Sequence, residues 1–376
     1  MPTNSRVLDP THLAARHPRS AWFLLAAAAL LLAACPAKQD PPTPETGKAP
    51  LATTAETPST DEAKSVTVYC GRSKTLVQPV FDAFTKESGI AVKARYGKTT
   101  ALANTLMEEG AGSPADVFFA QDAGALGAVA AKGLLTPLPK TLLEKVGARF
   151  RGRDGHWVGT SGRARVVVYN TDKLKAADLP DTLEGFTDPK WSGRIGWPTG
   201  NASFHAFVTA MRTLKDDAAT KTWLSGVQAN SPKVYPKNSP AVKAVAGGEI
   251  DVAFVNHYYL HRLRAEALAK DKDAPFPAAN YHPRGAGAGA MMNVAGVGIL
   301  ASSKARPVAQ KLAAFLLGET AQKHFTNASY EYPLVPGIPL NPAIPALETL
   351  KLPELDLGKL EDLEATMKLL RDAKVL

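Results

Sequence analysis

Cysteine is scarce in this sequence: the 376 residues contain two, Cys35 and Cys70. Two thiols exclude a disulfide-rich scaffold and a zinc site built from four cysteines. Long apolar runs are scarce too, because only residues 21–34 approach membrane length, and this excludes a polytopic membrane protein. Hydrophobic residues nevertheless make up 45% of the chain, which excludes wholesale disorder.

The charge balance is basic without being concentrated. Lys and Arg number 44 against 35 Asp and Glu, a formal net charge of 44 − 35 = +9, spread along the chain. A dispersed excess suits a soluble protein with anionic ligands about as well as one that binds nucleic acid. Signatures of nucleotide binding, serine hydrolysis and zinc hydrolysis are missing. We therefore expect a binding protein rather than an enzyme, without a nucleic-acid partner.

The N-terminus has the features of a secretory signal. Three arginines precede the almost wholly apolar run Ala21–Ala34, and Cys35 follows it directly. A basic region, a short apolar region and small residues before a cut site are typical of a signal peptide. The tetrad Leu-Ala-Ala-Cys resembles a bacterial lipobox, which implies a lipid on Cys35; a plain signal peptide or a short anchor helix is the alternative. We predict a lipoprotein signal over 1–35 and a flexible, Pro-rich linker over 36–64.

From residue 65 the hydrophobic pattern alternates between strands and helices. Short apolar runs predict the strands, and apolar residues at helical spacing predict the helices between them. The first stretch has predicted strands at 66–70, 90–96 and 116–120, with helices that end at Gly89, Gly110 and Gly133. The second has predicted strands at 166–169, 194–197, 233–235 and 251–255, with helices at about 203–214, 239–246 and 258–270. This order favours two parallel, doubly wound α/β lobes.

The two lobes could be separate domains or the halves of one clamshell. The apolar stretch Met291–Leu300 is long enough to return the chain from the second lobe to the first, and Arg163–Tyr169 is the matching outward crossing. Two crossings make a hinge. Lobe one is assigned to residues 65–165 and 289–340, and lobe two to residues 166–288 and 341–376.

Polar loops follow the predicted strands of both lobes. Open parallel sheets bind ligands beyond the carboxyl ends of their strands, and each of these loops opens a helix whose free N–H groups favour anions. The loops are Cys70–Lys74, Ala120–Asp122, Pro198–Ser203, Pro236–Ser239 and Asn256–Tyr259.

The adjacent tyrosines Tyr258 and Tyr259 permit two interpretations. Both rings could pack against their lobe, or both phenols could bind a hard trivalent cation. Free Tyr titrates near about 10, so divalent ions rarely ionise it, whereas Fe³⁺ is a stronger Lewis acid that prefers anionic oxygen. His257 and His261, four residues apart, could bind a divalent metal or be exposed on a helix.

Several segments together resemble the periplasmic ferric-ion-binding proteins, in order over about residues 66–334. They are Ser113–Phe119, Ser161–Val166, Asp188–Gly196, Gly248–Asp251 with Asn256–Tyr259, and Tyr330–Leu334. The resemblance implies a two-lobed clamshell that is the substrate-binding component of an ABC importer, with permease and ATPase subunits as partners. It also implies Fe³⁺ held with a synergistic anion, carbonate or phosphate.

The resemblance further implies residue roles. The paired iron ligands fall on Tyr258 and Tyr259. The anion-binding positions fall on Asn201, Ala202, Ser203, Asn238 and Asn256, and the cleft arginine on Arg165. The iron-binding His and Glu of the family fall on Ser73 and Gln121, which we group with the anion-binding residues because neither is a strong iron ligand.

Three functions stay open. The first is a monomeric extracytoplasmic lipoprotein, anchored only by its lipid, that closes around Fe³⁺ and an anion and delivers them to an ABC permease. The second keeps the fold but binds an oxyanion, a phosphonate or a small organic solute, and Ser73 and Gln121 favour it. The third is a secreted enzyme such as a hydrolase, against which the lack of a placed nucleophile–base pair argues.

Overall fold

The computed structural model describes residues 64–376, so the predicted signal with Cys35 and the linker up to residue 63 lie outside the described residues. The strands in this range are β1 (Ser65–Cys70), β2 (Ala91–Tyr96), β3 (Val117–Ala120), β4 (Leu135–Thr136), β5 (Val158–Asn170), β6 (Ile195–Trp197), β7 (Lys233–Val234), β8 (Val252–Asn256), β9 (Ala278–Tyr281), β10 (Met292–Leu300) and β11 (Tyr332–Pro333). The α-helices are α1 (Lys74–Ser88), α2 (Thr99–Glu109), α3 (Ala123–Ala131), α4 (Lys140–Leu143), α5 (Ala202–Leu214), α6 (Asp217–Ala229), α7 (Asn238–Ala246), α8 (Tyr258–Leu268), α9 (Arg306–Leu316), α10 (Glu319–Asn327) and α11 (Leu363–Asp372).

One sheet runs through the described residues in the order β2-β1-β3-β10-β5-β8-β6-β7. At one end β1 pairs in parallel with β2 and β3, and α1 and α2 connect these strands. At the other end β6 pairs in parallel with β7 and β8, with α5, α6 and α7 between them in the chain. These two groups are the doubly wound α/β lobes that the sequence predicts, so the predicted fold class is confirmed.

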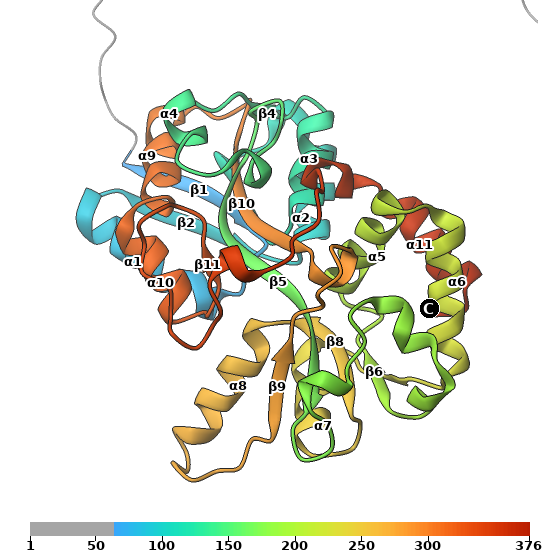
Figure 1. The fold of residues 1–376 in the computed structure, drawn as a ribbon. Helices are drawn as coiled ribbons and strands as arrows, with labels where there is room; N and C mark the ends of the chain where they lie inside the picture. Colours follow the sequence, from blue (N-terminus) through green and yellow to red (C-terminus); the bar gives the residue numbers. More distant parts are fainter. Residues whose placement is uncertain (1–63) are drawn as a thin grey trace, which may run out of the picture. The chain divides into compact units, whose positions relative to one another are not determined.

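Strand β5 joins the two lobes. Its residues 158–164 pair with β10, whereas residues 165–169 pair with β8 and residues 167–170 with β9. Figure 1 shows β5 running from the elements around β1 and β10 toward those around β6 and β8. The outward crossing is therefore made near Arg165, inside the predicted segment.

The return crossing lies before the predicted stretch Met291–Leu300. Among the described residues, β10 pairs with β3, β4 and β5 and so already belongs to lobe one. The chain crosses between Tyr281, where β9 ends, and Met291. The amide of Arg165 donates to the carbonyl of Met291 at 2.9 Å, which ties the two crossings together.

Lobe two is packed around an aromatic cluster. Ring centroids of neighbouring members lie 5.5 to 6.5 Å apart in the set Trp197, Phe204, Phe207, Trp223 and Phe254. Aromatic rings bury a large area for few rotatable bonds. The cluster therefore fixes the end of β6 relative to the start of α5, which is where the predicted anion loop lies.

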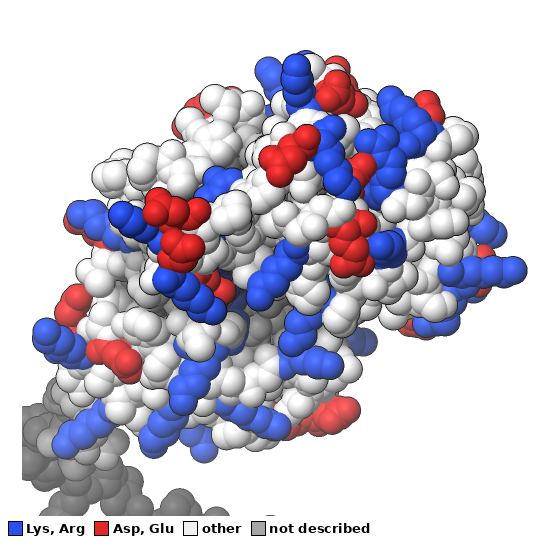
Figure 2. Space-filling view, turned by 90° about the horizontal axis from the view of Figure 1, so that it is seen from below, with Lys and Arg blue, Asp and Glu red and all other residues white. Residues whose placement is uncertain are grey.

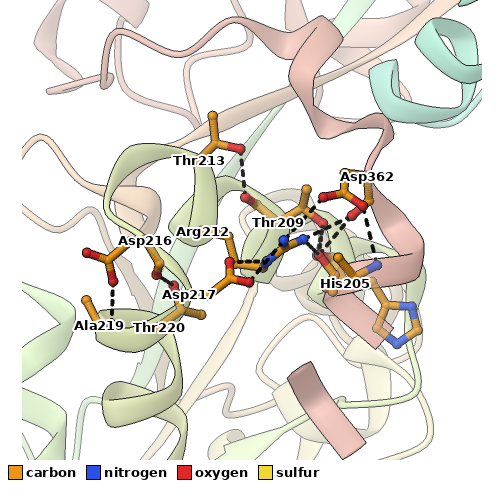
Figure 3. Close-up of polar contacts among 11 residues, drawn as sticks. His205, Thr209, Arg212, Thr213, Asp216, Asp217, Ala219, Thr220 and Asp362 are labelled. Atoms are coloured by element: carbon orange, nitrogen blue, oxygen red, sulfur yellow. Dashed lines mark hydrogen bonds and ion pairs between the residues drawn. The ribbon is translucent and has the colours of Figure 1, made fainter. Parts of the chain in front are cut away.

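The C-terminal tail contacts both lobes. The short turn η8 (Leu357–Glu361) packs so closely on α3 that a Cβ at Gly124 would lie 2.3 Å from the Leu360 carbonyl oxygen. Beyond η8, α11 packs against α5 and α6. Figure 3 shows the polar contacts there: Arg212 of α5 bonds to Asp217 of α6 and to Asp362 at the start of α11.

The described residues contain no helix that is both long and apolar enough to cross a membrane. Figure 2 shows one face of the molecule, where acidic side chains lie among the basic ones. The basic excess is thus dispersed on that face, as the sequence predicts.

Candidate functional site

The two adjacent tyrosines lie where β8 gives way to α8. Their rings are stacked, with centroids 4.2 Å apart and planes 29° from parallel. Tyr258 is 4% exposed, whereas Tyr259 is half-buried. The sequence places them there because α8 begins directly after a fully buried strand, so its first residues are held at the carboxyl edge of the sheet.

His257 fixes the start of α8 and is not exposed, contrary to the surface interpretation. Its Nδ1 accepts from the amide of Ala164 at 3.2 Å, and its Nε2 donates to the carbonyl of Tyr330 at 2.7 Å. Burial lowers the pKa of His257 to about 3, so the ring is neutral at ordinary pH. Both nitrogens are occupied, which excludes His257 as a metal ligand. The second histidine, His261, is also partly buried and accepts from Asn280.

Buried charges surround Tyr258 on the lobe-one side. Arg72 and Arg163 are 3% and 1% exposed, and Glu331 is 0% exposed. Nη2 of Arg72 donates to Glu331 at 2.5 Å, and the hydroxyl of Ser161 donates to the other carboxylate oxygen. Within the described residues, Nε and Nη2 of Arg163 and Nε of Arg72 have no hydrogen-bond partner. Glu331 acts on both arginines and Asp122 acts on Arg163, so two carboxyl groups face the two cations near Tyr258.

The free protein holds Tyr258 as a neutral phenol. Burial raises its pKa well above the usual value of about 10, and Tyr259 adds to the rise, whereas Arg163 opposes it. An ion that binds the Tyr258 oxygen must therefore displace a proton. This requirement selects a strong Lewis acid.

Arg165 and Asn256, both predicted site residues, contact each other. Nη1 of Arg165 donates to the Asn256 side-chain oxygen at 3.1 Å, and Nη2 donates to the Phe254 carbonyl at 2.9 Å. The guanidinium also lies over the Phe207 ring, 4.8 Å from its centroid. Burial lowers the pKa of Arg165, and the negative charge of an ionised Tyr259 would raise it. The structure thus places a held cation beside the tyrosine pair.

The predicted anion loop is joined to Asn238. Asn201 caps α5 by accepting from the amide of Ser203 at 2.9 Å and from its hydroxyl at 2.8 Å. Asn238, fully buried at the start of α7, donates to the Ser203 hydroxyl at 3.1 Å, and Ala202 is the first residue of α5. The starts of α5 and α7 thus meet, and their free N–H groups favour an anion.

Ser73 and Gln121 are not linked to this group. Ser73 is exposed, and its hydroxyl bonds to that of Thr75. Gln121 is half-buried, and its backbone amide donates to Thr99. Among the described residues, neither side chain hydrogen-bonds to a tyrosine or asparagine of the site. A cavity of about 360 Å³ separates the start of α3, which follows Gln121, from the start of α5.

Sequence reasoning missed Arg72 and Glu331 as members of the site, although both lie in segments that it singled out. Arg72 follows β1 and Glu331 precedes β11, so only the fold brings them together. The described residues contain no group of three or more His, Cys, Asp or Glu side chains that could hold a metal ion. A metal site here therefore depends on the phenols of Tyr258 and Tyr259.

Comparison with protein families matches residues 80–351 to the bacterial extracellular solute-binding proteins. The chain is 36% identical to the major ferric iron-binding protein of Neisseria meningitidis over 332 residues. The aligned region covers 86% of this chain and 97% of the relative. It is 33% identical over 327 residues to the Fe(3+)-binding periplasmic protein of Serratia marcescens, over 87% of this chain and 94% of the relative.

Solved structures agree with these relatives. Iron-bound HitA from Pseudomonas aeruginosa is 34% identical and superposes with a TM-score of 0.76, over 82% of this chain and 99% of that one. The apo ferric ion-binding protein A of Pasteurella haemolytica is 28% identical, with a TM-score of 0.75 over 83% and 98% of the two chains.

Proposed function

The chain belongs to the bacterial extracellular solute-binding proteins, as one of the periplasmic ferric-ion-binding proteins, and we propose that it captures Fe³⁺ for uptake. The ion is bound with a synergistic anion, carbonate or phosphate, and is delivered to the permease of an ABC importer. The protein acts as a carrier, because the cargo leaves it chemically unchanged.

The observation that carries this proposal is the stacked Tyr258–Tyr259 pair near the buried Arg163, whose Nε and Nη2 have no hydrogen-bond partner among the described residues. Phenolate oxygens are hard anionic donors, which Fe³⁺ prefers and divalent ions rarely generate. When Fe³⁺ displaces the phenol protons, the two phenolates face Arg163 and Arg165. The negative charges of the two phenolates are thus balanced by arginine side chains inside the protein.

The anion completes the coordination of the ion. Two tyrosines supply two of the roughly six donors of an octahedral Fe³⁺ site, so the anion and water supply most of the rest. Asn201, Ser203 and Asn238 hold the anion at the starts of α5 and α7, together with Ala202 and Asn256. Ser73 and Gln121 reach the cargo from lobe one when the lobes close around it.

Delivery depends on closure and on tethering. Cargo that contacts both lobes favours the closed population, and the permease recognises that closed form. A lipid on Cys35 and the predicted linker over residues 36–64 would keep the protein, as a monomer, at the extracytoplasmic face of a membrane.

An optical titration tests the proposal. Purified protein with Fe³⁺ and carbonate or phosphate is expected to develop a visible tyrosine-to-iron charge-transfer band. Tyr258→Phe and Tyr259→Phe are each expected to weaken the band, and the double variant to abolish it. Tyr96→Phe is the matched control, because the Tyr96 hydroxyl bonds to Gln78 in lobe one. A wild-type protein that stays colourless contradicts the proposal.

A second candidate, an oxyanion or phosphonate carrier, is favoured by one observation. The unpartnered guanidinium of Arg163 is a donor group suited to phosphoryl or carboxyl oxygens. This candidate predicts that methylphosphonate raises the melting temperature of iron-free protein while Fe³⁺ produces no colour. The titration above therefore separates the two functions.

A further inference from the structure

The turn formed by residues 329–332 has an unusual backbone. Tyr330 has a φ of 56°, in the left-handed region that bulky residues rarely adopt. The turn follows α10, and the amide of Glu331 donates back to the Phe325 carbonyl of that helix at 2.9 Å. Glycine is the usual residue where a helix ends in this conformation, so an aromatic side chain here points to a second role.

Lobe one holds this turn in its strained form. One carboxylate oxygen of Glu331 accepts from Arg72 at 2.5 Å, and the other accepts from the Ser161 hydroxyl. The following residue, Tyr332, pairs with β5. The backbone of Tyr330 therefore cannot relax without disturbing a buried ion pair, and surroundings of this kind are what allow strain to persist.

The same turn contacts the start of α8 in lobe two. The carbonyl of Tyr330 accepts from Nε2 of His257 at 2.7 Å. Its ring stacks on that of His261, with centroids 5.6 Å apart and planes 24° from parallel. The ring of Tyr332 also lies beside His257, at 4.9 Å between centroids. Because His257 and His261 are four residues apart, these contacts span the first turn of α8.

His257 carries this contact to the candidate iron ligands. Its backbone amide donates to the Ala164 carbonyl at 3.0 Å, and its Nδ1 accepts from the Ala164 amide at 3.2 Å. The ring is thus held between β5 and Tyr330, and it packs edge-on to the next residue, Tyr258, at 5.9 Å between centroids. From lobe two, Asn280 of β9 donates to the carbonyl of His257 at 2.9 Å. Groups of both lobes therefore fix the place where the tyrosine pair begins.

We propose that Tyr330 is a positioning residue for the Tyr258–Tyr259 pair. Its strained backbone presents a carbonyl to His257, its ring packs on His261, and together these contacts fix the start of α8. The phenols are then held in place before cargo arrives, which reduces the ordering cost of binding. The inference rests on the proposed function, since it assigns a residue that supports the proposed iron ligands.

A purely structural role for Tyr330 makes a different prediction. If the residue only ends α10, Tyr330→Gly relieves the backbone strain and leaves iron affinity unchanged. If Tyr330 positions the tyrosine pair, the same change removes the ring that packs on His261, and iron affinity falls. The melting temperature of the iron-free variant is expected to stay within about 3 °C of wild type, because strain relief offsets the lost ring contact.

Chelator competition and the energy of the charge-transfer band test the proposal. Tyr330→Gly is expected to lose iron affinity by ~10-fold and His257→Phe by ~100-fold, the range typical of residues that orient metal ligands, and both are expected to shift the band. Tyr330→Phe keeps the ring and is expected to stay within about twofold of wild type. His324→Phe is the matched control, because Nε2 of His324 bonds to the Leu76 carbonyl at 2.8 Å inside lobe one, away from α8.

Hydrogen exchange gives a readout that needs no iron. The amides of residues 262–265 bond to the first turn of α8. In iron-free Tyr330→Gly we expect these amides to exchange ~10-fold faster than in wild type, because the first turn opens locally. Exchange in α2, which lies in lobe one, is expected to stay unchanged and serves as the internal reference.

The outcomes separate the inference from the function on which it rests. A wild-type protein that binds no iron overturns both. If the wild type binds iron, a Tyr330→Gly variant with unchanged affinity and an unchanged band overturns the inference alone. An equal loss of affinity in His324→Phe, or faster exchange throughout the fold of Tyr330→Gly, also overturns it. Loss of affinity with faster exchange confined to α8, and wild-type behaviour of Tyr330→Phe, support it.

Discussion

The two walls of the predicted site are built differently. On the lobe-two wall Asn201, Ser203 and Asn238 form one hydrogen-bonded chain, and Arg165 is bonded to Asn256. On the lobe-one wall Ser73 and Gln121 lie apart from this network, and Ser73 is exposed. Preorganised groups bind without an ordering cost, whereas loosely held ones must be fixed. On the proposed function, we therefore expect cargo to be captured on lobe two before lobe one closes over it.

The largest expected effect comes from removing the candidate ligands that each lobe contributes. The double variant Tyr258→Phe with Tyr259→Phe is expected to lose iron affinity by more than the roughly 10- to 100-fold that is typical when a residue supporting a metal ligand is replaced. The double variant Ser73→Ala with Gln121→Ala is expected to stay within about threefold, because both side chains are weak donors. Chelator competition at fixed pH and fixed carbonate measures both. Equal losses of iron affinity in the two double variants would mean that both lobes contribute equally to binding, and would contradict the proposed difference between them.

A pH series sharpens the tyrosine side. The raised pKa of Tyr258 means that the free protein carries this proton at neutral pH. On the proposed function, the iron complex does not carry it. Binding that releases a proton is favoured as pH rises and lost as pH falls, by ~10-fold per pH unit for each proton. Proton release on loading, measured in weakly buffered solution, is expected to fall by one per iron in Tyr258→Phe. An unchanged proton count would remove Tyr258 from the set of ligands.

A variant that binds iron more tightly tests the contribution of lobe one. Gln121→Glu is expected to tighten iron binding by about tenfold, because a carboxylate is a harder and more anionic donor than an amide oxygen. The residue stands just before Asp122, the N-cap of α3, which accepts from the Ala125 amide at 2.9 Å, so the loop itself is already fixed. Gln121→Asn is the matched control, since it shortens the side chain without adding charge. If both variants equal wild type, position 121 does not reach the cargo.

Local signals in the sequence predicted the elements that position the site. Gly89 ends α1, as predicted, with a φ of 73°, a left-handed conformation that glycine adopts without strain. Asp122, the last residue of a predicted polar loop, caps α3. Helix α2 ends at Glu109, before Gly110, as expected. Trp157, Trp191 and Trp197 are among the largest fully buried side chains. Such signals act within a few residues, so a single sequence displays them.

What the sequence could not predict depends on distant contacts. Arg72 and Glu331 are 259 positions apart, and no local pattern in either segment predicts their ion pair. The sequence left His257 as either a divalent-metal ligand or an exposed helix residue, whereas tertiary contacts with Ala164 and Tyr330 bury it. Helices α6, α9 and α10 received no prediction. The roles of Tyr258 and Tyr259 remain predictions that geometry supports.

The smallest expected effect concerns the tail that contacts both walls: η8 packs on α3, which follows Gln121, and α11 packs on α5, which begins at Ala202. Asp362 pairs with Arg212 at 3.2 Å, but its side chain is 56% exposed and Arg212 keeps its bond to Asp217. Asp362→Asn is therefore expected to cost no more than ~0.5 kcal/mol in unfolding free energy, as for an exposed ion pair, since Asn can still cap α11. Asp362→Ala also removes the cap, which accepts from the Ala365 amide, and should cost ~1 kcal/mol.

Denaturant melts measure both losses, and iron affinity is expected to stay within about twofold of wild type. A larger change in affinity than in stability would show that the tail couples the two walls, and the contrast between them would then depend on this third connection as well as on the residues that face the cargo.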